Sequence, residues 1–262
     1  MGKIIERDRS IIPACDVPLK VFEQLVKATG DLDVIGGYKI GPALTGRPGY
    51  DAVVEVARYE TGKPLIFDGQ KLGTDTPDTA RSILEQMKES GIDAVILFPQ
   101  SGPVTEYSWI KTAQELGLGV IVGGEMTHAR YLDGDFSNER NKDGTVKTDY
   151  SAIFHQLGMV DQTGFIRPEG VLMMYLIAAK LGVEDFVVPG NKPERIALYK
   201  SYIEEQGGIE NPSFFSPGFV AQGGEVSKGA AAAGQRFHAI VGRGIYEARD
   251  MRQAAIELGS KL

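Results

Sequence analysis

The sequence predicts a single (β/α)8 (TIM) barrel with an insertion after its fifth strand. The length of 262 residues matches the roughly 250 residues of such a barrel. Eight short apolar runs alternate with helical stretches, and the runs are continuously apolar, which is typical of parallel strands covered by helices. No GxGxxG motif follows the first run, and the glycine-rich loops come late, after the last two strands. These observations favour a closed barrel over an open dinucleotide-binding sheet.

Each predicted strand is rich in Ile, Val, Leu or Phe and is bounded by turn-forming or charged residues. In chain order the strands are residues 10–15, 34–40, 64–68, 93–98, 118–123, 185–189, 213–216 and 237–241.

The predicted helices have apolar residues at helical spacing. They are residues 19–28, 50–59, 79–90, 109–116, 170–181, 193–205, 225–233 and 246–258. Pro193 suits the first position of a helix, and Gly117 marks the turn between a helix and the next strand.

A polar stretch at residues 133–147 (DGDFSNERNKDGTVK) separates the fifth strand from the next helix. We expect one domain over residues 1–262, with an insertion at about residues 129–160. The insertion follows the carboxyl end of a strand, where barrel enzymes carry their active sites. Two interpretations stay open, a solvated loop and a lid over the barrel mouth.

Composition excludes several classes of protein. A single cysteine, Cys15, rules out a disulfide framework and a cysteine-rich zinc site. The formal net charge of −7 argues against general binding to nucleic acid or anionic membranes. No apolar run approaches 18 residues, and the charged N-terminus lacks a signal-peptide pattern, so we expect a cytoplasmic protein without membrane contact. The absence of HxH, HExxH and DxD motifs predicts no metal site.

Charged residues gather at the ends of the first three strands. Asp16 ends the first strand and Lys39 the second, and Asp68, Lys71 and Asp75 follow the third. Because the carboxyl ends of barrel strands meet at one mouth, these side chains can form one network. Two carboxylates beside Lys71 would keep its amine protonated. The alternative is an ordinary solvated loop.

Two glycine-rich segments predict a phosphate site. Residues 216–224 (SPGFVAQGG) follow the seventh strand, and residues 240–246 (IVGRGIY) span the end of the eighth. Small residues let backbone N–H groups approach an anion, Gln222 adds a donor, and Arg243 can bind phosphate through two nitrogens. Each glycine pair alone could be a tight turn, but both lie where barrels bind phosphate.

These residues resemble the orotidine 5′-phosphate decarboxylase family over nearly the whole chain. The resemblance is carried by Asp16, the YKIG around Lys39, the Asp68/Lys71/Asp75 set with Pro77 and Thr79, EMTH at 125–128, PERI at 193–196, and the two glycine-rich segments. It implies a homodimer with shared active sites. It also implies conversion of orotidine 5′-monophosphate (OMP) to uridine 5′-monophosphate (UMP) and CO2, without cofactor or metal.

The resemblance also implies roles for single residues. Lys71 would protonate C6 of the pyrimidine, and Asp68 would lie against the substrate carboxylate and disfavour the ground state. Asp75 would reach into the partner's site, and Lys39 would connect the charged network with the ribose. The remaining implied substrate-binding residues are Asp16 and Thr79 for the ribose hydroxyls, Thr127 for the pyrimidine edge, Pro217, and Gln222, Gly242 and Arg243 for the phosphate.

The charged set departs from the family in its spacing. The family has DxKxxD, and this chain has DxxKxxxD, with Thr76 after the second Asp where the family usually has Ile. Residues i and i+2 share a face of a strand, so a bulge at Gly69 is expected if Lys71 is to point into the mouth.

Two other functions stay open. One is a metal-using sister enzyme acting on sugar phosphates, such as 3-keto-gulonate 6-phosphate decarboxylase or hexulose phosphate synthase. The other is a barrel that binds nucleotide phosphate without catalysis.

Overall fold

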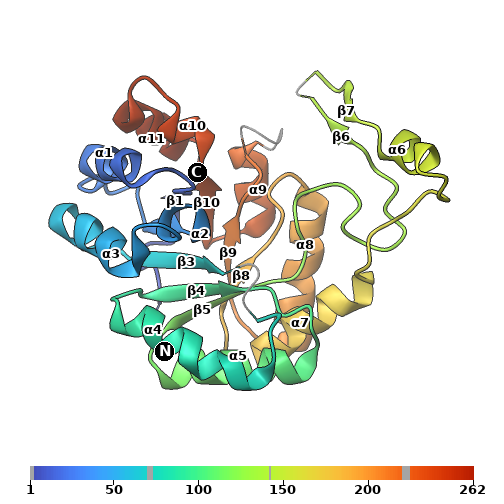
Figure 1. Cartoon of the computed structure of the whole chain (residues 1–262), viewed down its shortest axis with the longest axis horizontal. Helices are drawn as coiled ribbons and strands as arrows, with labels where there is room; N and C mark the ends of the chain where they lie inside the picture. Colours follow the sequence, from blue (N-terminus) through green and yellow to red (C-terminus); the bar gives the residue numbers. More distant parts are fainter. Residues whose placement is uncertain (1–2, 70–72, 142, 220–224) are drawn as a thin grey trace.

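Eight parallel strands form the wall of a barrel, and helices surround it (Figure 1). The computed structural model describes residues 3–69, 73–141, 143–219 and 225–262. The barrel strands are β1 (Arg9–Pro13), β2 (Tyr38–Ile40), β3 (Leu65–Gly69), β4 (Ala94–Leu97), β5 (Gly119–Gly123), β8 (Asp185–Val187), β9 (Ser213–Ser216) and β10 (Phe237–Val241).

The outer helices follow the strands in alternation. They are α1 (Leu19–Thr29), α2 (Pro42–Thr45), α3 (Gly49–Glu60), α4 (Ala80–Glu89), α5 (Pro103–Glu115), α7 (Pro168–Lys180), α8 (Pro193–Tyr202), α9 (Val226–Ala233), α10 (Arg243–Tyr246) and α11 (Met251–Gly259). A 3-10 turn (Pro77–Thr79) precedes α4, and a π-helical turn (Ile203–Gly207) extends α8.

The strand order β1-β10-β9-β8-β5-β4-β3-β2 is that of a nearly closed barrel, which confirms the predicted fold class. Single bridges, Ile11 with Ile35 and Ala14 with Lys39, join its first and last strands. The predicted strand at 34–40 is interrupted, because Ile35 pairs with β1 whereas β2 pairs with β3. Gly36 lies at this break, where a Cβ would come within 2.2 Å of the Ser10 hydroxyl. Only glycine allows the backbone to approach so closely.

The helix ends differ from the predictions where capping residues decide them. α5 begins at Pro103, six residues before the predicted start, because Gly102 takes a φ of 114° and proline suits the first helical position. The predicted final helix is divided into α10 and α11. The Asp250 side chain caps α11 by accepting a hydrogen bond from the Gln253 N–H.

Within the described ranges, no helix is long and apolar enough to cross a membrane.

The barrel interior is a packed core rather than a channel. Inward-facing side chains such as Ile12, Ile66, Ile121 and Phe215 are at most 1% exposed. A second, larger apolar layer lies between the strands and the helices. Polar side chains of the strands therefore meet solvent mainly at the two ends of the barrel.

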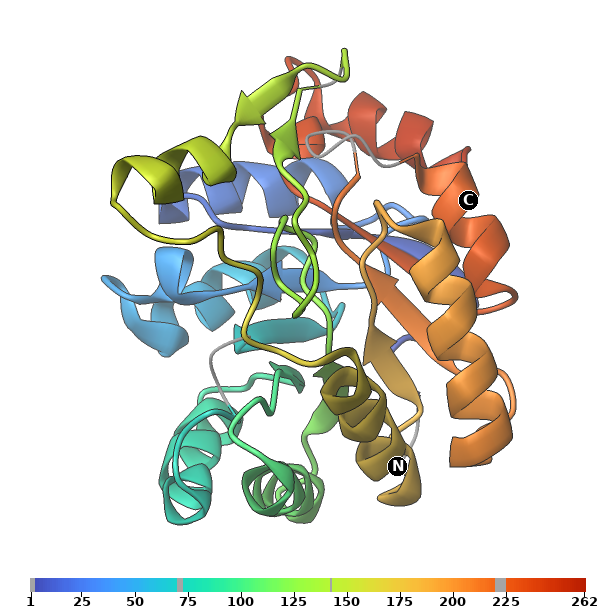
Figure 2. The same ribbon diagram turned by 90° about the vertical axis from the view of Figure 1, so that its right-hand side faces the viewer.

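The segment between β5 and α7 leaves the barrel as an arm, which we define as residues 133–164. It contains β6 (Glu139–Arg140), β7 (Val146–Thr148) and α6 (Tyr150–Gln156). Figures 1 and 2 show it standing away from the barrel on the side where the strands end. Arg130 organises its base: its guanidinium donates to Asp161 (2.5 Å), the Gln162 carbonyl (2.7 Å) and Ser151 (2.8 Å).

The two ends of the arm meet at a narrow neck. Leu132 and Ile166 form a bridge, in which the Asp133 N–H donates to the Ile166 carbonyl at 2.8 Å. The Gly164 N–H donates to the Leu132 carbonyl at 3.0 Å. A Cβ on Gly164 would lie 2.0 Å from the Tyr131 carbonyl oxygen, so this position requires glycine.

Candidate active site

A lysine between two carboxylates lies at the mouth of the barrel. Lys39 at the end of β2 forms an ion pair with Asp68 of β3, and its Nζ lies 3.6 Å from Oδ2 of Asp16, which follows β1. The Lys39 side chain is 7% exposed and that of Asp68 is 13% exposed. The structure thus brings together three of the five charged residues that the sequence placed at this end.

The electrostatics of this cluster keep Lys39 charged. Burial alone would lower the pKa of Lys39, but the carboxylates of Asp68 and Asp16 outweigh it, so the pKa is raised. The amine is therefore a fixed positive charge in a water-poor position, held between two acids. Such a group can orient carboxylates and hydroxyls without exchanging a proton itself.

The loop before α4 carries Asp75 and Thr79. Asp75 is exposed, and its Oδ1 accepts a hydrogen bond from the Thr76 N–H at 2.7 Å. The Thr79 hydroxyl donates to the Thr76 carbonyl at 2.8 Å. Ser108 of α5 donates to the Pro77 carbonyl at 2.8 Å, which holds this turn against α5. Residues 76–79 are therefore anchored, while Asp75 is exposed.

Lys71 and Gln222 lie outside the described residues, within residues 70–72 and 220–224. The β3–β4 ladder runs in regular register through Asp68 with Ile96 and Gly69 with Leu97. A bulge at Gly69 would place Gln70 opposite the same partner residue, and Gln70 lies outside the described residues, so this bulge stays a prediction.

The predicted phosphate side is formed by the ends of β9 and β10. β10 pairs with both β9 and β1, so Pro217 and Gly242 follow strands that end beside Asp16. The Pro217 carbonyl accepts from the Gly190 N–H at 2.8 Å, and Gly218 takes a φ of 105°, which favours glycine. Arg243 begins α10 and is exposed.

Thr127 lies on the segment that follows β5, and its carbonyl accepts a hydrogen bond from the Asn191 side chain at 3.1 Å. Beside it, Glu125 forms a buried ion-pair network with Lys192 and Arg195, which the sequence analysis missed. The sequence does hold a signal for this network. An acid lies two residues after β5, two cations lie at the start of α8, and β5 pairs with β8, the strand before α8.

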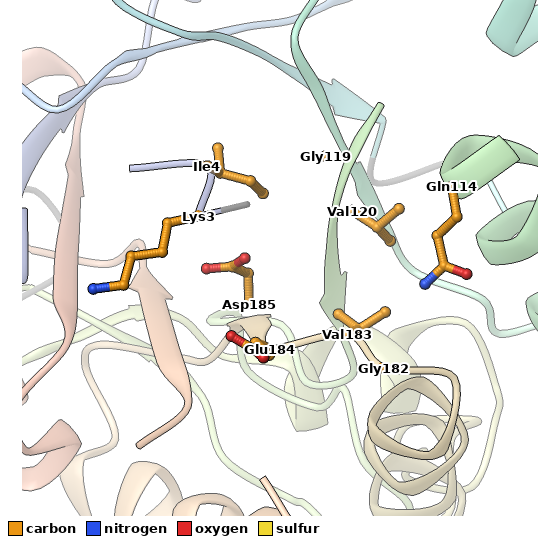
Figure 3. Close-up of a pocket in the computed structure, with 9 residues that line it drawn as sticks. All are labelled: Lys3, Ile4, Gln114, Gly119, Val120, Gly182, Val183, Glu184 and Asp185. Atoms are coloured by element: carbon orange, nitrogen blue, oxygen red, sulfur yellow. The ribbon is translucent and has the colours of Figure 1, made fainter. Parts of the chain in front are cut away.

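The opposite end of the barrel carries buried polar groups of another kind. His238 of β10 is fully buried, as its place within a strand predicts, and burial lowers its pKa to about 3. Burial also raises the pKa of Asp185, the first residue of β8, to about 6. Asp185 borders a pocket of about 50 Å³ at this end, shown in Figure 3. Its lining residues are Lys3, Ile4, Gln114, Gly119, Val120, Gly182, Val183, Glu184 and Asp185.

In residues 3–69, 73–141, 143–219 and 225–262, no group of three or more His, Cys, Asp or Glu side chains is arranged to hold a metal ion.

The fold and the mouth define a (β/α)8-barrel protein with a buried lysine–carboxylate centre and a glycine-rich wall after its last two strands. The chain belongs to the orotidine 5′-phosphate decarboxylase / HUMPS family, whose model matches residues 9–258.

Individual relatives agree with this membership. The chain is 28% identical to an orotidine 5′-phosphate decarboxylase of Methanosarcina barkeri over 98% of this chain and 96% of the relative. It is 29% identical to that of Methanosarcina mazei, over 98% and 97%.

Solved structures share the fold. The orotidine 5′-monophosphate decarboxylase of Methanocaldococcus jannaschii, complexed with the inhibitor BMP, superposes with a TM-score of 0.73 at 21% identity, covering 98% of this chain and 99% of that one. The orotidine 5′-phosphate decarboxylase of Pyrococcus horikoshii gives a TM-score of 0.69 at 25% identity, covering 96% and 98%.

Proposed function

We propose that this protein decarboxylates OMP to UMP and CO2. The observation that carries the proposal is the buried Lys39 held between Asp16 and Asp68 where the first three strands end. The family membership and the names of the relatives support the same reaction.

In the proposed reaction, the bond between C6 and the carboxyl carbon breaks and its electron pair stays on C6. CO2 leaves, and the Lys71 ammonium group delivers a proton to C6. The role of Lys71 rests on the family motif. Asp68 lies beside the substrate carboxylate and disfavours the ground state, while Lys39 holds Asp68 in place.

Substrate binding would use both walls of the mouth. Asp16 and Thr79 hold the ribose hydroxyls, and Thr127 contacts the pyrimidine edge. Pro217, Gln222, Gly242 and Arg243 form the phosphate side. Phosphate binding is remote from C6, and its binding energy can help to close the site around the substrate.

Asp75 acts in the site of a second subunit in this proposal. The exposure of its carboxylate in the single chain supports this role, because the group is accessible to a partner. Homodimerisation and a cytoplasmic location stay predictions of the sequence. The arm is proposed as a lid, since it stands on the side of the barrel where the strands end.

The family also includes the HUMPS members, so a metal-using sugar-phosphate enzyme is the second candidate. The relatives described above are all named as orotidine 5′-phosphate decarboxylases, which favours the first candidate. A barrel that binds nucleotides without turnover is the third.

One assay separates the three candidates. Purified protein is mixed with OMP in the presence of EDTA, and the loss of orotate absorbance in the ultraviolet is followed. Rapid loss with UMP as product supports decarboxylation without a metal. No loss with tight UMP binding indicates the binding barrel, and activity on sugar phosphates only after addition of Mg²⁺ indicates the sister enzyme.

A further inference from the structure

The main chain that ends β5 is fixed from both sides. The Gly124 N–H donates to the Tyr175 hydroxyl at 3.2 Å, and that hydroxyl donates to the Val187 carbonyl at 2.8 Å. The Tyr131 hydroxyl donates to the Gly124 carbonyl at 2.7 Å. Two tyrosines from different parts of the chain thus hold the peptide groups on either side of Gly124.

Glu125, the next residue, is the centre of a buried ion-pair network. Its side chain is 2% exposed, with Oε1 2.8 Å from Nζ of Lys192 and Oε2 2.8 Å from Nε of Arg195. The Tyr199 hydroxyl also donates to Oε2 and accepts from Nη2 of Arg195 at 2.7 Å. A buried carboxylate with two cations and a hydroxyl is well satisfied, and removing its charge leaves the cations unpaired.

The same contacts continue to Thr127. Nζ of Lys192 donates to the Met126 carbonyl at 3.4 Å, and Nδ2 of Asn191 donates to the Thr127 carbonyl at 3.1 Å. Three consecutive residues after β5 are therefore bound to the segment that opens α8. We call this set of contacts, from Glu125–Thr127 to residues 191–195, the Glu125 clamp.

The position of the arm explains why such a clamp is useful. The arm begins at residue 133, a few residues beyond Thr127, so movements of the arm would otherwise reach Thr127 through the chain. The clamp ties Thr127 instead to α8, whose Ile196 and Tyr199 are buried in the apolar layer between strands and helices.

We infer that Glu125 is a positioning residue that sets the place of Thr127 against the nucleobase. This inference rests on the proposed function for the role of Thr127. The described residues proposed for ribose and phosphate follow β1, β3, β9 and β10 rather than β5. Loss of the clamp therefore alters recognition of the base and leaves recognition of the ribose phosphate intact.

The test compares two ligands that differ only in the base. Dissociation constants of UMP and of ribose 5-phosphate are measured by calorimetry for the wild type and for Glu125→Gln, which keeps the size of the side chain and removes its charge. UMP binding is expected to weaken about tenfold, while ribose 5-phosphate binding stays within twofold. Equal weakening for both ligands, or no weakening for either, overturns the inference.

Further variants control for general damage. Glu204→Gln removes a charge from a surface ion pair with Lys200 and should change neither constant. Glu125→Asp keeps the charge and should recover part of the UMP affinity. If Glu125→Gln does not fold, Asn191→Ala removes only the contact to the Thr127 carbonyl and should give the same selective loss, about threefold in size. An equal effect of Asn191→Ala on both ligands, or none, counts against the clamp.

Failure of the inference and failure of the proposed function give different results. A wild type that binds UMP but does not decarboxylate OMP, with the selective loss in Glu125→Gln, refutes the function and keeps the clamp. A wild type that decarboxylates OMP, without the selective loss, refutes the clamp alone. A wild type that binds neither UMP nor OMP refutes both.

Discussion

Buried polar groups are paired at the mouth of the barrel, whereas at its other end some of their atoms have no hydrogen-bond partner among the described residues. At the mouth, Lys39 meets two carboxylates and Glu125 meets two cations. At the other end, Oδ1 of Asp185 and Nε2 of His238 are buried without a hydrogen-bond partner among the residues described. That Asp185 oxygen forms an ion pair with Nη2 of Arg236, which lies 3.8 Å away and beyond hydrogen-bond distance.

Charged groups at the mouth serve the proposed function, whereas the buried groups at the other end affect mainly the stability of the fold. Burying a charge costs free energy, and pairing it recovers much of the cost while fixing its direction, which a reacting site requires. Burial is the largest cause of the raised pKa of Asp185 and of the lowered pKa of His238, so these groups change how stability depends on pH without touching the chemistry. Variants at the mouth should therefore change turnover or substrate binding, and variants at the other end should change the pH dependence of stability.

The largest effect is expected from removing the central cation of the mouth. In Lys39→Met the carboxylates of Asp16 and Asp68 lose their shared partner, and turnover of OMP should fall about 10³-fold. Steady-state assays at neutral pH measure this. Lys27→Met, at an exposed position of α1, is the matched control and should keep full activity. Turnover within tenfold of the wild type in Lys39→Met would place the chemistry elsewhere.

The next effect concerns stability in acid. The folded-state pKa of His238, about 3, lies below its unfolded value of 6.5, so the unfolded chain binds the proton more tightly. Stability is therefore lost as the pH falls below about 6.5, by about 3 kcal/mol at pH 4.5.

Urea unfolding of the wild type and His238→Asn at pH 7 and pH 4.5 tests this statement. The variant should lose less stability in acid, and its activity at pH 7 should match the wild type. A parallel loss of stability in both proteins would show that His238 does not titrate on unfolding.

A smaller effect is expected from Arg243→Ala. Loss of charge-assisted hydrogen bonds to the phosphate should lower kcat/KM for OMP about 100-fold and leave the unfolding midpoint unchanged, because Arg243 is exposed. Arg249→Ala, another exposed arginine near the C-terminus, is the control. The proposal for Arg243 fails if both variants keep the wild-type kcat/KM.

The last effect is again one of stability and is expected from Asp185→Asn. The folded-state pKa of Asp185, about 6, lies above the model-peptide value of 3.8, so burial of the charged form weakens the protein as the pH rises from 4 to 6. The amide variant should be more stable than the wild type by about 3 kcal/mol at pH 7, with most of the difference lost near pH 4. Thermal unfolding at the two pH values measures it, and a constant difference would contradict the assignment.

Much of the fold follows from the sequence because apolar runs and helical periodicity repeat eight times. The positions of Asp16, Lys39 and Asp68 at one mouth follow too, since parallel strands all end on the same side. The break at Gly36 was not predicted, because it depends on the close approach of Ser10 from another strand. The regular register at Gly69 and the Glu125 clamp also depend on contacts between distant segments, which local patterns do not contain.

The neck of the arm lets the arm and the barrel evolve separately within one chain. Leu132 and Ile166 lie side by side, so everything between them can lengthen, shorten or be exchanged while the barrel strands keep their partners. Selection can therefore act on the arm and on the barrel independently. Insertions at this single point can give such a protein a new surface over its mouth, while the strand pairing of its barrel stays unchanged.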